Sequence, residues 1–327
     1  MQEQVGSPDL SNSNTKNIDM RLVFIATGDI ALPSFRHLLK HGPRPLLLVT
    51  QPDKPVGRHQ TLTPPAIKVE ALAAGIPVLQ PEKIGDAAEE LAALDPEILV
   101  VMAYGQILRK NILTLASKAI INLHASLLPK YRGAACIQAA IDAGDSESGV
   151  TAMHVVRELD AGDMILSKAI PITADETGGT LHDRLADLAA DVLAEALGKL
   201  ADGTAVRVPQ DATLASYIPK LGRDDGRIDW SQSAAAIERR IRAYDPWPGT
   251  FTTAIEGGKE KRLKIYPPAA VQEGALAPGE IFTEGARLIV GCGEGVLEMT
   301  SVQPEGGKRM SASDYLRGRS LEAFRQG

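Results

Sequence analysis

The chain has 327 residues, 44% hydrophobic and 23% charged, which argues against an intrinsically disordered chain and favours two domains over one. The net charge of −6 argues against a protein that binds nucleic acid through its overall charge, although a local basic face stays compatible with this value. No apolar run approaches the ~18 residues that a membrane-spanning helix needs, and two cysteines, Cys136 and Cys292, argue against a disulfide framework. We therefore expect a cytoplasmic protein without membrane association.

Residues 1–19 open the chain with a polar stretch rich in Ser, Asn and Asp. This stretch lacks the apolar core of a signal peptide, and its acidic residues argue against a transit peptide. We expect a disordered leader, with Met20 as an alternative start.

The next part of the chain alternates short apolar runs with helical patterns. The expected strands are 21–26, 45–50, 77–79, 97–102 and 119–123, and the expected helices between them are 35–41, 66–74 and 87–94. Continuous apolar strands that alternate with helices are typical of a parallel sheet covered on both faces. The fold class is therefore α/β, with a mostly parallel, Rossmann-like sheet.

The rhythm changes after residue 150. Two strands, 151–156 and 164–170, flank a turn, and a long amphipathic helix follows over 180–201. Beyond an aperiodic stretch and a helical pattern over 227–245, short strands recur at 251–255, 263–266, 287–290 and 296–302, as in a small β-barrel. We expect a catalytic domain over 20–205, a linker over 206–222 and a second domain over 223–327.

Several common sites are absent from the sequence. The turn after the first strand reads Ala26-Thr27-Gly28-Asp29, which does not fit a dinucleotide fingerprint, and no phosphate-binding loop follows. His37 and His41 have helical spacing, but no third metal ligand lies nearby. We expect surface histidines and no metal site.

The densest group of polar side chains lies between residues 120 and 133. Asn122 and His124 alternate at the end of an apolar strand, so their side chains share one face. Open α/β sheets bind ligands at the carboxyl ends of their strands. The residues alone leave two interpretations open, a catalytic pair or a strand end capped by an amide and an imidazole.

The segment Asn122-Leu-His124-Ala-Ser126-Leu-Leu-Pro129, followed by Gly133, resembles the signature of the 10-formyltetrahydrofolate-dependent transformylases. That family pairs its asparagine and histidine with an aspartate in a downstream Asp-x-Gly turn. The turn Asp160-Ala-Gly162 stands at the matching separation. The resemblance therefore implies Asn122, His124 and Asp160 as catalytic residues. Cys136 is a departure, because relatives carry proline there.

These three side chains suit the chemistry that the resemblance implies. When an amine attacks a formyl carbon, negative charge builds on the formyl oxygen, and Asn122 could donate a hydrogen bond to it. His124 could donate or shuttle a proton. Asp160 would set the charge and tautomer of the imidazole, or relay the amine proton through a water.

The resemblance also implies 10-formyltetrahydrofolate as the formyl donor. In related enzymes a loop after a buried strand binds the pterin through its backbone, and a neighbouring turn forms another wall. The matching residues here are Tyr104, Gly105, Gln106, Ile107 and Leu108 in the loop, and Ser126, Leu127, Leu128 and Pro129 in the turn.

The second half of the chain resembles methionyl-tRNA formyltransferases. The segments that carry this resemblance are Tyr217-Ile-Pro-Lys220, Gly226-Arg-Ile-Asp229-Trp230 and Ile241-Arg242-Ala243-Tyr244-Asp-Pro246-Trp247-Pro248-Gly249, and it runs from about Met20 almost to the end. It implies an OB-like C-terminal barrel that contacts tRNA, an initiator methionyl-tRNA substrate, a role in translation initiation, and a monomer. Thr50 to Arg58 matches the loop that these enzymes wedge against the acceptor stem, with Arg58 as its key arginine.

Residues 208–327 hold 16 basic and 16 acidic residues, so tRNA binding requires cations gathered on one face. We expect Arg239 and Arg242, at helical spacing, and Lys261 and Lys264, on a turn and strand, to bind tRNA together with Arg58. A solvated surface is the alternative for these cations. Two further functions stay open, a formyltransferase acting on an amino sugar nucleotide or other small amine, and a folate- or RNA-binding protein that has lost catalysis.

Overall fold

The computed structural model describes residues 20–57, 59–317, 319 and 321–325, so the expected leader over 1–19 lies outside the described part. The described residues form two compact units. One comprises residues up to Ile120 together with Ala194–Ala205, and the other comprises Ile121–Leu193 together with the residues from Val206 onward. Among the helices described, none combines the length and apolarity that a membrane crossing needs.

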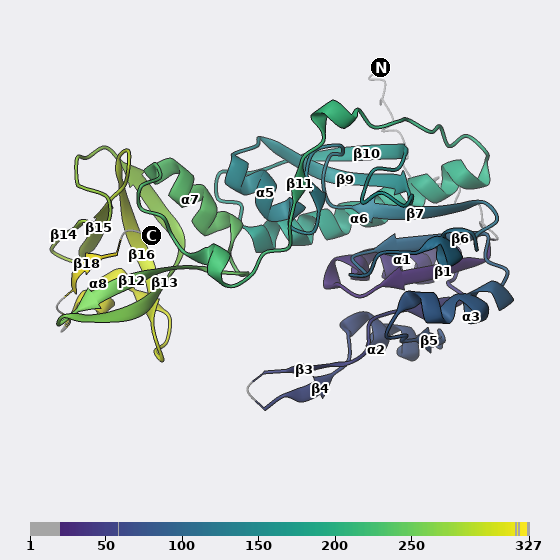
Figure 1. Ribbon diagram of the computed structural model, residues 1–327, viewed down its shortest axis with the longest axis horizontal. Coiled ribbons are helices and arrows are strands. Elements are labelled where there is room, and N and C mark those ends of the chain that lie inside the picture. Colours follow the sequence, from purple (N-terminus) through teal and green to yellow (C-terminus); the bar gives the residue numbers. More distant parts are fainter. Residues whose placement is uncertain (1–19, 58, 318, 320, 326–327) are drawn as a thin grey trace, which may run out of the picture. The chain divides into compact units, whose positions relative to one another are not determined.

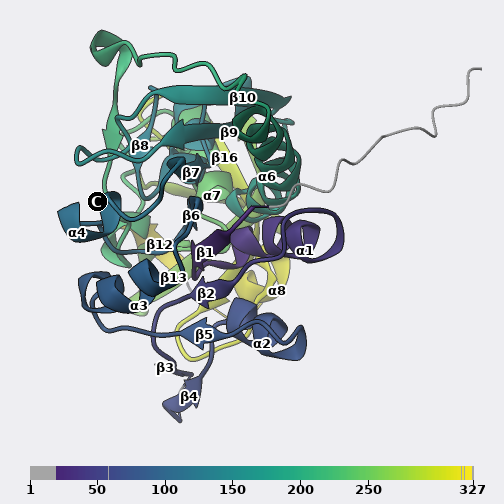
Figure 2. The same cartoon turned by 90° about the vertical axis from the view of Figure 1, so that its right-hand side faces the viewer.

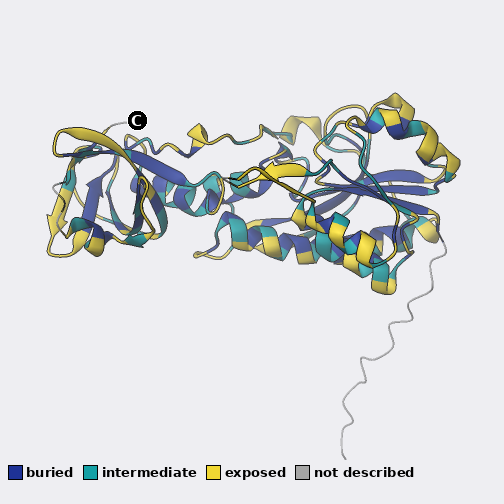
Figure 3. Cartoon of the chain, turned by 90° about the horizontal axis from the view of Figure 1, so that it is seen from below, coloured by how far each residue is buried: buried dark blue, intermediate teal, exposed yellow. Residues whose placement is uncertain are grey.

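The first unit contains a parallel sheet. Its strands lie in the order β6-β1-β2-β5, and every pairing among them is parallel. All five residues of β1 are buried, because both faces of the sheet are covered. The strands are β1 (Leu22–Ala26), β2 (Leu47–Val49), β5 (Val78–Leu79) and β6 (Ile98–Met102). Figure 3 shows strands of this sheet as buried along their length.

Helices lie on both faces of this sheet, with α1 and α2 on one side and α3 and α4 on the other (Figure 2). They are α1 (Leu32–His41), α2 (Ala66–Ala73), α3 (Ala88–Ala93) and α4 (Lys110–Leu113). The proline in the first turn of α1 suits a helix start, because the missing N–H would have no helical partner there. The predicted Rossmann-like, mostly parallel α/β sheet is confirmed.

A short hairpin follows β2 and was not predicted. Its strands, β3 (Lys54–Val56) and β4 (Thr61–Thr63), pair antiparallel and are exposed throughout (Figure 1). Arg58, predicted to contact tRNA, lies outside the described residues.

Antiparallel strands β7 (Ala119–His124), β9 (Glu147–His154) and β10 (Met164–Pro171) lead into the second unit. They lie in the order β7-β9-β10. Most of β10 alternates between more and less buried residues, as expected for an antiparallel strand with one solvated face. Helix α5 (Cys136–Ala143) ends at Gly144, whose φ of 77° is the left-handed conformation common at helix ends, and α6 (Gly178–Ala201) is the long helix that was predicted.

The C-terminal part is a small antiparallel barrel-like sheet, as predicted. Its strands lie in the order β14-β15-β16-β13-β12-β18, with β17 paired to β16. They are β12 (Thr250–Glu256), β13 (Lys259–Gln272), β14 (Ile281–Glu284), β15 (Arg287–Gly291), β16 (Val296–Pro304), β17 (Met310–Ser311) and β18 (Leu321–Phe324), joined by α7 (Ala234–Ala243) and α8 (Ala312–Leu316).

Trp230 lies in the core of this barrel-like sheet. Its side chain is fully buried, it stacks on Phe324 with ring centroids 5.5 Å apart, and its Nε1 donates a 2.9 Å hydrogen bond to Thr252 Oγ1. A buried indole N–H needs such a partner, so the polar and apolar requirements of this residue are both met.

Part of the segment expected to be an aperiodic linker forms a strand. Residues Tyr217–Ile218 (β11) pair in parallel with Arg132–Gly133 (β8). The segment from Gln210 to Ile218, which we call the strap, therefore contacts the loop that follows β7.

Candidate active site

Asn122 and His124 lie on the same face of β7 near its carboxyl end. Antiparallel pairing with β9 fixes their register, with Asn122 opposite Met153 and His124 opposite Thr151. The Asn122 side chain is only partly buried, and it makes no hydrogen bond to any of the described residues. Its amide is thus available to a ligand.

The His124 imidazole is buried and oriented by the backbone of the following loop. Its Nε2 lies 2.9 Å from the carbonyl oxygen of Tyr131, so Nε2 carries the hydrogen of this bond. Its Nδ1 lies 3.9 Å from Asp160 Oδ2, which is longer than a direct hydrogen bond. Nδ1 therefore makes no direct hydrogen bond to Asp160, and a substrate group or a bridging water can join the two.

Asp160 reaches the histidine from the turn between β9 and β10. Its Oδ2 accepts a 2.8 Å hydrogen bond from the backbone N–H of Gly133. Asp160 adopts a φ of 51°, a left-handed conformation that aspartate tolerates better than most residues. At Gly162 a Cβ would lie 1.7 Å from the carbonyl oxygen of His154, so only glycine fits. The glycine of the Asp-x-Gly pattern is therefore required by the tight turn, and this turn places the Asp160 carboxylate beside the imidazole.

Burial of the ring lowers the pKa of His124, but Cys136, the Asp160 carboxylate and the Tyr131 carbonyl together raise it from 6.5 to about 9. The imidazole is accordingly protonated at neutral pH and can donate to a developing oxyanion. Cys136 is buried at the start of α5, and its charge interaction and hydrogen bond with the ring come first among the effects that raise the pKa of His124. Neither Tyr131 nor Cys136 was predicted to act on the histidine.

The raised pKa predicts the alkaline side of the pH profile. With the protonated ring as the predicted donor, kcat/KM is expected to fall about tenfold per pH unit once the pH exceeds about 9. In Cys136→Ala the same limb should move to lower pH, since the largest raising contribution is lost. Both are read from kcat/KM measured across neutral to alkaline pH, and a limb that stays in place in Cys136→Ala contradicts this assignment. The same raised pKa stabilises the folded state below pH 6.5, a contribution that is lost as the pH rises through about 9.

The residues predicted to bind the folate lie in two segments, one in each compact unit. In the first unit, Tyr104 and Leu108 are buried, Gly105 has a φ of 85°, and Ile107 is exposed. The Gln106 side chain accepts from the backbone N–H of Ile84 at 2.8 Å and donates to the carbonyl of Glu82 at 2.9 Å, so it anchors the loop.

The Tyr104 hydroxyl is buried without a hydrogen-bond partner in the described part of the chain, and burial raises the pKa of Tyr104 to about 12. This hydroxyl stays neutral and has an unused donor. A buried polar group of this kind favours a ligand or water as its partner.

In the second unit, the turn predicted as another wall of the folate site is tied to its neighbours. Ser126 Oγ donates to the carbonyl of Lys130 at 2.8 Å, and the backbone N–H of Leu128 donates to Thr151 Oγ1 at 3.2 Å. Pro129 follows Leu128 through a cis peptide bond, and Leu127 is partly buried. The turn is thus held in one conformation beside the histidine strand.

Three of the four described cations predicted to bind tRNA have protein partners. Arg239 Nε donates to the carbonyl of Asp142 at 3.1 Å, Arg242 pairs with Glu238 at 2.6 Å, and Lys261 pairs with Glu256 at 2.8 Å. Lys264 has no such partner among the described residues, and it points into a pocket.

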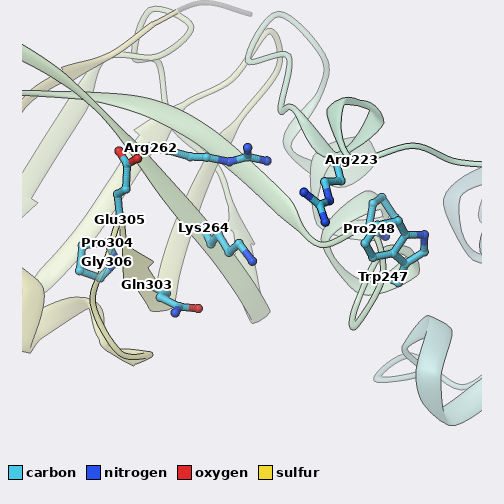
Figure 4. A pocket seen from close by; sticks show the side chains of 9 residues that line it. All are labelled: Arg223, Trp247, Pro248, Arg262, Lys264, Gln303, Pro304, Glu305 and Gly306. Atoms are coloured by element: carbon cyan, nitrogen blue, oxygen red, sulfur yellow. The ribbon is translucent and has the colours of Figure 1, made fainter. Parts of the chain in front are cut away.

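This basic pocket has a volume of about 400 Å³ and lies on the C-terminal part. Arg223, Arg262 and Lys264 point toward the same space (Figure 4). Arg262 lies over the ring of Phe251, 3.4 Å from its centroid, and none of the three cations pairs with a carboxylate in the described ranges. The remaining lining residues are Trp247, Pro248, Gln303, Pro304, Glu305 and Gly306. The pocket thus combines positive charge with a half-exposed indole, and neither Arg223 nor Trp247 was predicted to bind tRNA.

No cluster of three or more metal-ligating side chains occurs in the part of the chain that the structure describes. The donors at β7 are an amide, an imidazole and a carboxylate, which together suit hydrogen bonding and proton transfer.

The chain matches the formyl transferase model over residues 20–197 and the formyl transferase C-terminal domain model over residues 220–320. The methionyl-tRNA formyltransferase of Akkermansia muciniphila is 52% identical over 304 residues, which cover 91% of this chain and 96% of that protein. This chain belongs to the methionyl-tRNA formyltransferase family. The family's enzyme from Marinobacter nauticus is 44% identical, again over 91% of this chain and 96% of that protein.

Solved structures share the fold at lower identity. An N-formyltransferase from Helicobacter canadensis, in complex with folinic acid and dTDP-3-aminofucose, has a TM-score of 0.65 at 17% identity and covers 89% of this chain and 100% of that chain. HypX from Aquifex aeolicus, in complex with tetrahydrofolic acid, has a TM-score of 0.61 at 17% identity over 91% of this chain and 47% of that chain. Both support the formyltransferase fold.

Proposed function

We propose that this protein transfers the formyl group of 10-formyltetrahydrofolate to the α-amino group of initiator methionyl-tRNA, giving N-formylmethionyl-tRNA for translation initiation. The observation that carries the proposal is the His124–Asp160 pair, with 3.9 Å between Nδ1 and Oδ2, on the β7 face that also bears the unpaired amide of Asn122. Relatives of 44% and 52% identity over nearly their whole length are methionyl-tRNA formyltransferases.

Each of the three residues has a defined part in the transfer. The amine nitrogen forms the new bond to the formyl carbon, and the Asn122 amide donates a hydrogen bond to the oxygen on which charge builds. The protonated His124 ring stabilises the same charge through Nδ1–H. Asp160 keeps the ring charged until it accepts the proton that the amine loses, directly or through water, and this proton then passes to the folate nitrogen as its bond to the formyl carbon breaks.

We infer that the folate contacts Tyr104, Gly105, Gln106, Ile107 and Leu108, and the turn of Ser126, Leu127, Leu128 and Pro129. The buried, unpartnered hydroxyl of Tyr104 and the anchored Gln106 loop support this assignment. 10-Formyltetrahydrofolate is consumed as a cosubstrate, and no metal takes part in the proposed steps.

We infer that the basic pocket binds the tRNA backbone. Lys264 is a predicted tRNA contact that lines this pocket, and no carboxylate of the described residues pairs with it; Arg223 and Arg262 add their charge. Trp247 offers a face on which an unpaired base can stack. Arg58, Arg239, Arg242 and Lys261 stay predicted contacts, the last three with their charge shared with protein partners.

Removing cations from this pocket should weaken tRNA binding without slowing the chemical step. Lys264→Ala and Arg223→Ala are each expected to raise KM for tRNA by about tenfold and to reduce the slope of log Kd against log salt by about 0.7–0.9, with kcat unchanged. Filter binding and steady-state kinetics at several salt concentrations measure both quantities.

Arg287→Ala is the matched control. Arg287 is a cation of the same sheet but lies on β15, and its charge is paired with Glu298 at 2.8 Å. It should leave the salt slope as in the unaltered protein. Equal slopes in Lys264→Ala and Arg287→Ala would exclude the pocket as a phosphate contact.

The proposed activity is tested with two acceptors. The protein is incubated with 10-formyltetrahydrofolate and either charged initiator tRNA or an amino sugar nucleotide, and the formylated product is quantified. Formylation of the tRNA is expected. Formylation of the sugar nucleotide alone would replace the proposal with the sugar-modifying alternative, and binding without turnover of either acceptor would favour a protein that has lost catalysis.

We further infer a catalytic domain over 20–205, a linker over 206–222 and a tRNA-binding domain over 223–327, consistent with the two formyl transferase models over 20–197 and 220–320. One chain supplies Asn122, His124 and Asp160, so we propose that a monomer suffices for catalysis. A substrate used in translation initiation favours a cytoplasmic location.

A further inference from the structure

The strap, residues 210–218, is hydrogen-bonded to the loop that orients His124. The backbone N–H of Tyr131 donates to Ser216 Oγ at 2.9 Å, and that of Arg132 donates to the carbonyl of Ser216 at 2.8 Å. A Cβ on Gly133 would lie 2.3 Å from the carbonyl oxygen of Ile218, so the strap approaches as closely as a glycine allows. The conformation of this loop is therefore held by a segment that is distant in sequence.

The side-chain amide of Gln210 joins three parts of the site. Its Oε1 accepts from Arg132 Nη2 at 2.8 Å and from Arg132 Nε at 3.1 Å. Its Nε2 donates to the carbonyl of Asp160 at 2.9 Å and to the carbonyl of Gly162 at 2.8 Å. Both acceptor positions and both donor hydrogens of the amide are thus used.

These bonds act on the two groups that flank the His124 ring. Arg132 lies between Tyr131, whose carbonyl meets His124 Nε2, and Gly133, whose N–H meets Asp160 Oδ2. The Asp160 turn, with its left-handed φ of 51°, is held at its own carbonyl by Gln210. A shift of the Gln210 amide would therefore displace both the Tyr131 carbonyl and the Asp160 carboxylate that flank the imidazole.

We propose that Gln210 is a positioning residue for formyl transfer, because its amide fastens the Asp160 turn to the Tyr131–Gly133 loop and so fixes both partners of the His124 ring. The proposal rests on the proposed function, in which that ring and Asp160 act on the substrate. Glutamine is required by chemistry, since one side must accept from a guanidinium while the other donates to two carbonyls. An ionised glutamate can only accept hydrogen bonds, and methionine, of similar length, donates none and is only a weak acceptor.

Two variants separate the two halves of this role. Gln210→Met removes every bond of the amide without adding charge, whereas Gln210→Glu keeps an acceptor for Arg132 but loses the donors to Asp160 and Gly162. Both should lower kcat by about 10- to 100-fold with KM for folate and tRNA within about twofold, as expected when catalytic groups are displaced but binding surfaces remain. If Gln210→Glu turns over normally, the hold on the Asp160 turn is excluded.

A readout that a merely structural role would not change is the titration of His124. In Gln210→Met the displaced carboxylate and carbonyl no longer favour the charged ring, so the pKa of His124 should fall from about 9 toward 6.5. This is followed by NMR on the ring resonance that disappears in His124→Ala. An unchanged titration with unchanged kcat, or a lower melting temperature alone, would overturn the proposal.

Leu214→Ala is the matched control, because Leu214 lies in the same strap with an exposed side chain. It should leave kcat and the His124 titration as they are. Gln210 is only partly buried, so its variants are expected to fold, and thermal unfolding verifies this. Failure of the unaltered protein to formylate charged tRNA would reject the proposed function, whereas the titration would still decide the role of Gln210.

Discussion

His124→Ala is expected to lower kcat for formylation of methionyl-tRNA by about 10²–10⁴, because the transfer loses the protonated donor beside the formyl oxygen. The ring is buried between the Tyr131 carbonyl and the Asp160 carboxylate, so no other described side chain takes its place. Single-turnover kinetics with preloaded substrates measure the chemical step apart from product release.

Two further variants sharpen this result. His124→Asn keeps a hydrogen-bond donor but cannot exchange a proton at neutral pH, so its rate should lie between those of the alanine variant and the unaltered protein. His182→Ala, which removes a half-buried histidine paired with Asp183 on α6, should have no effect on kcat. A His124→Ala rate within a few-fold of the unaltered protein would remove His124 from the mechanism.

Asn122→Ala is expected to lower kcat by about 10²–10³ with little change in KM, because a donor to an oxyanion acts mainly in the transition state. The amide has no partner among the described side chains, so its removal leaves no unsatisfied protein group and should not destabilise the fold. Steady-state kinetics with both substrates varied separate the two constants.

Asn111→Ala serves as the control for Asn122. Asn111 is an exposed asparagine on α4 whose Nδ2 donates to the carbonyl of Gly85, and its loss should leave kcat unaltered. A rise in KM at constant kcat in Asn122→Ala would assign Asn122 to substrate binding instead of transition-state stabilisation.

The parallel sheet could be predicted because burial on both faces leaves a plain signature, a run of apolar residues such as 98–102 bounded by turn residues. The hairpin of β3 and β4 could not, since its strands are exposed on every residue and carry no apolar alternation. Strand β13 was predicted only over 263–266 because Pro267 and Pro268 resemble a strand end, yet pairing with β16 resumes beyond an irregularity there.

At the site, strand alternation correctly placed Asn122 and His124 on one face, and the Asp-x-Gly spacing brought Asp160 to the ring. The contributions of Tyr131 and Gln210 could not be predicted. Tyr131 acts through its backbone carbonyl, which every residue type has, so its identity carries no signal. Gln210 reaches the site from the strap, a segment without a periodic pattern.

Helical spacing of arginines predicted a cationic face on α7, but spacing does not reveal which carboxylates lie opposite. Asp142, on α5, pairs with Arg240 at 2.9 Å and accepts from Arg239 through its carbonyl. Charges that are close in sequence were therefore partly neutralised by neighbouring groups, whereas Arg223 joins Arg262 and Lys264 of β13 from a segment distant in sequence.

The two tryptophans of the chain lie in contrasting surroundings, one sealed in the core of the barrel-like sheet and one half-exposed at the basic pocket. Their fluorescence should therefore report two separate events. Trp230 emission should shift to longer wavelength only when the C-terminal sheet unfolds, whereas Trp247 emission should respond to quenchers and to whatever fills the pocket. Because the parallel sheet contains no indole, its unfolding is silent in this signal and must be followed by another spectroscopic probe.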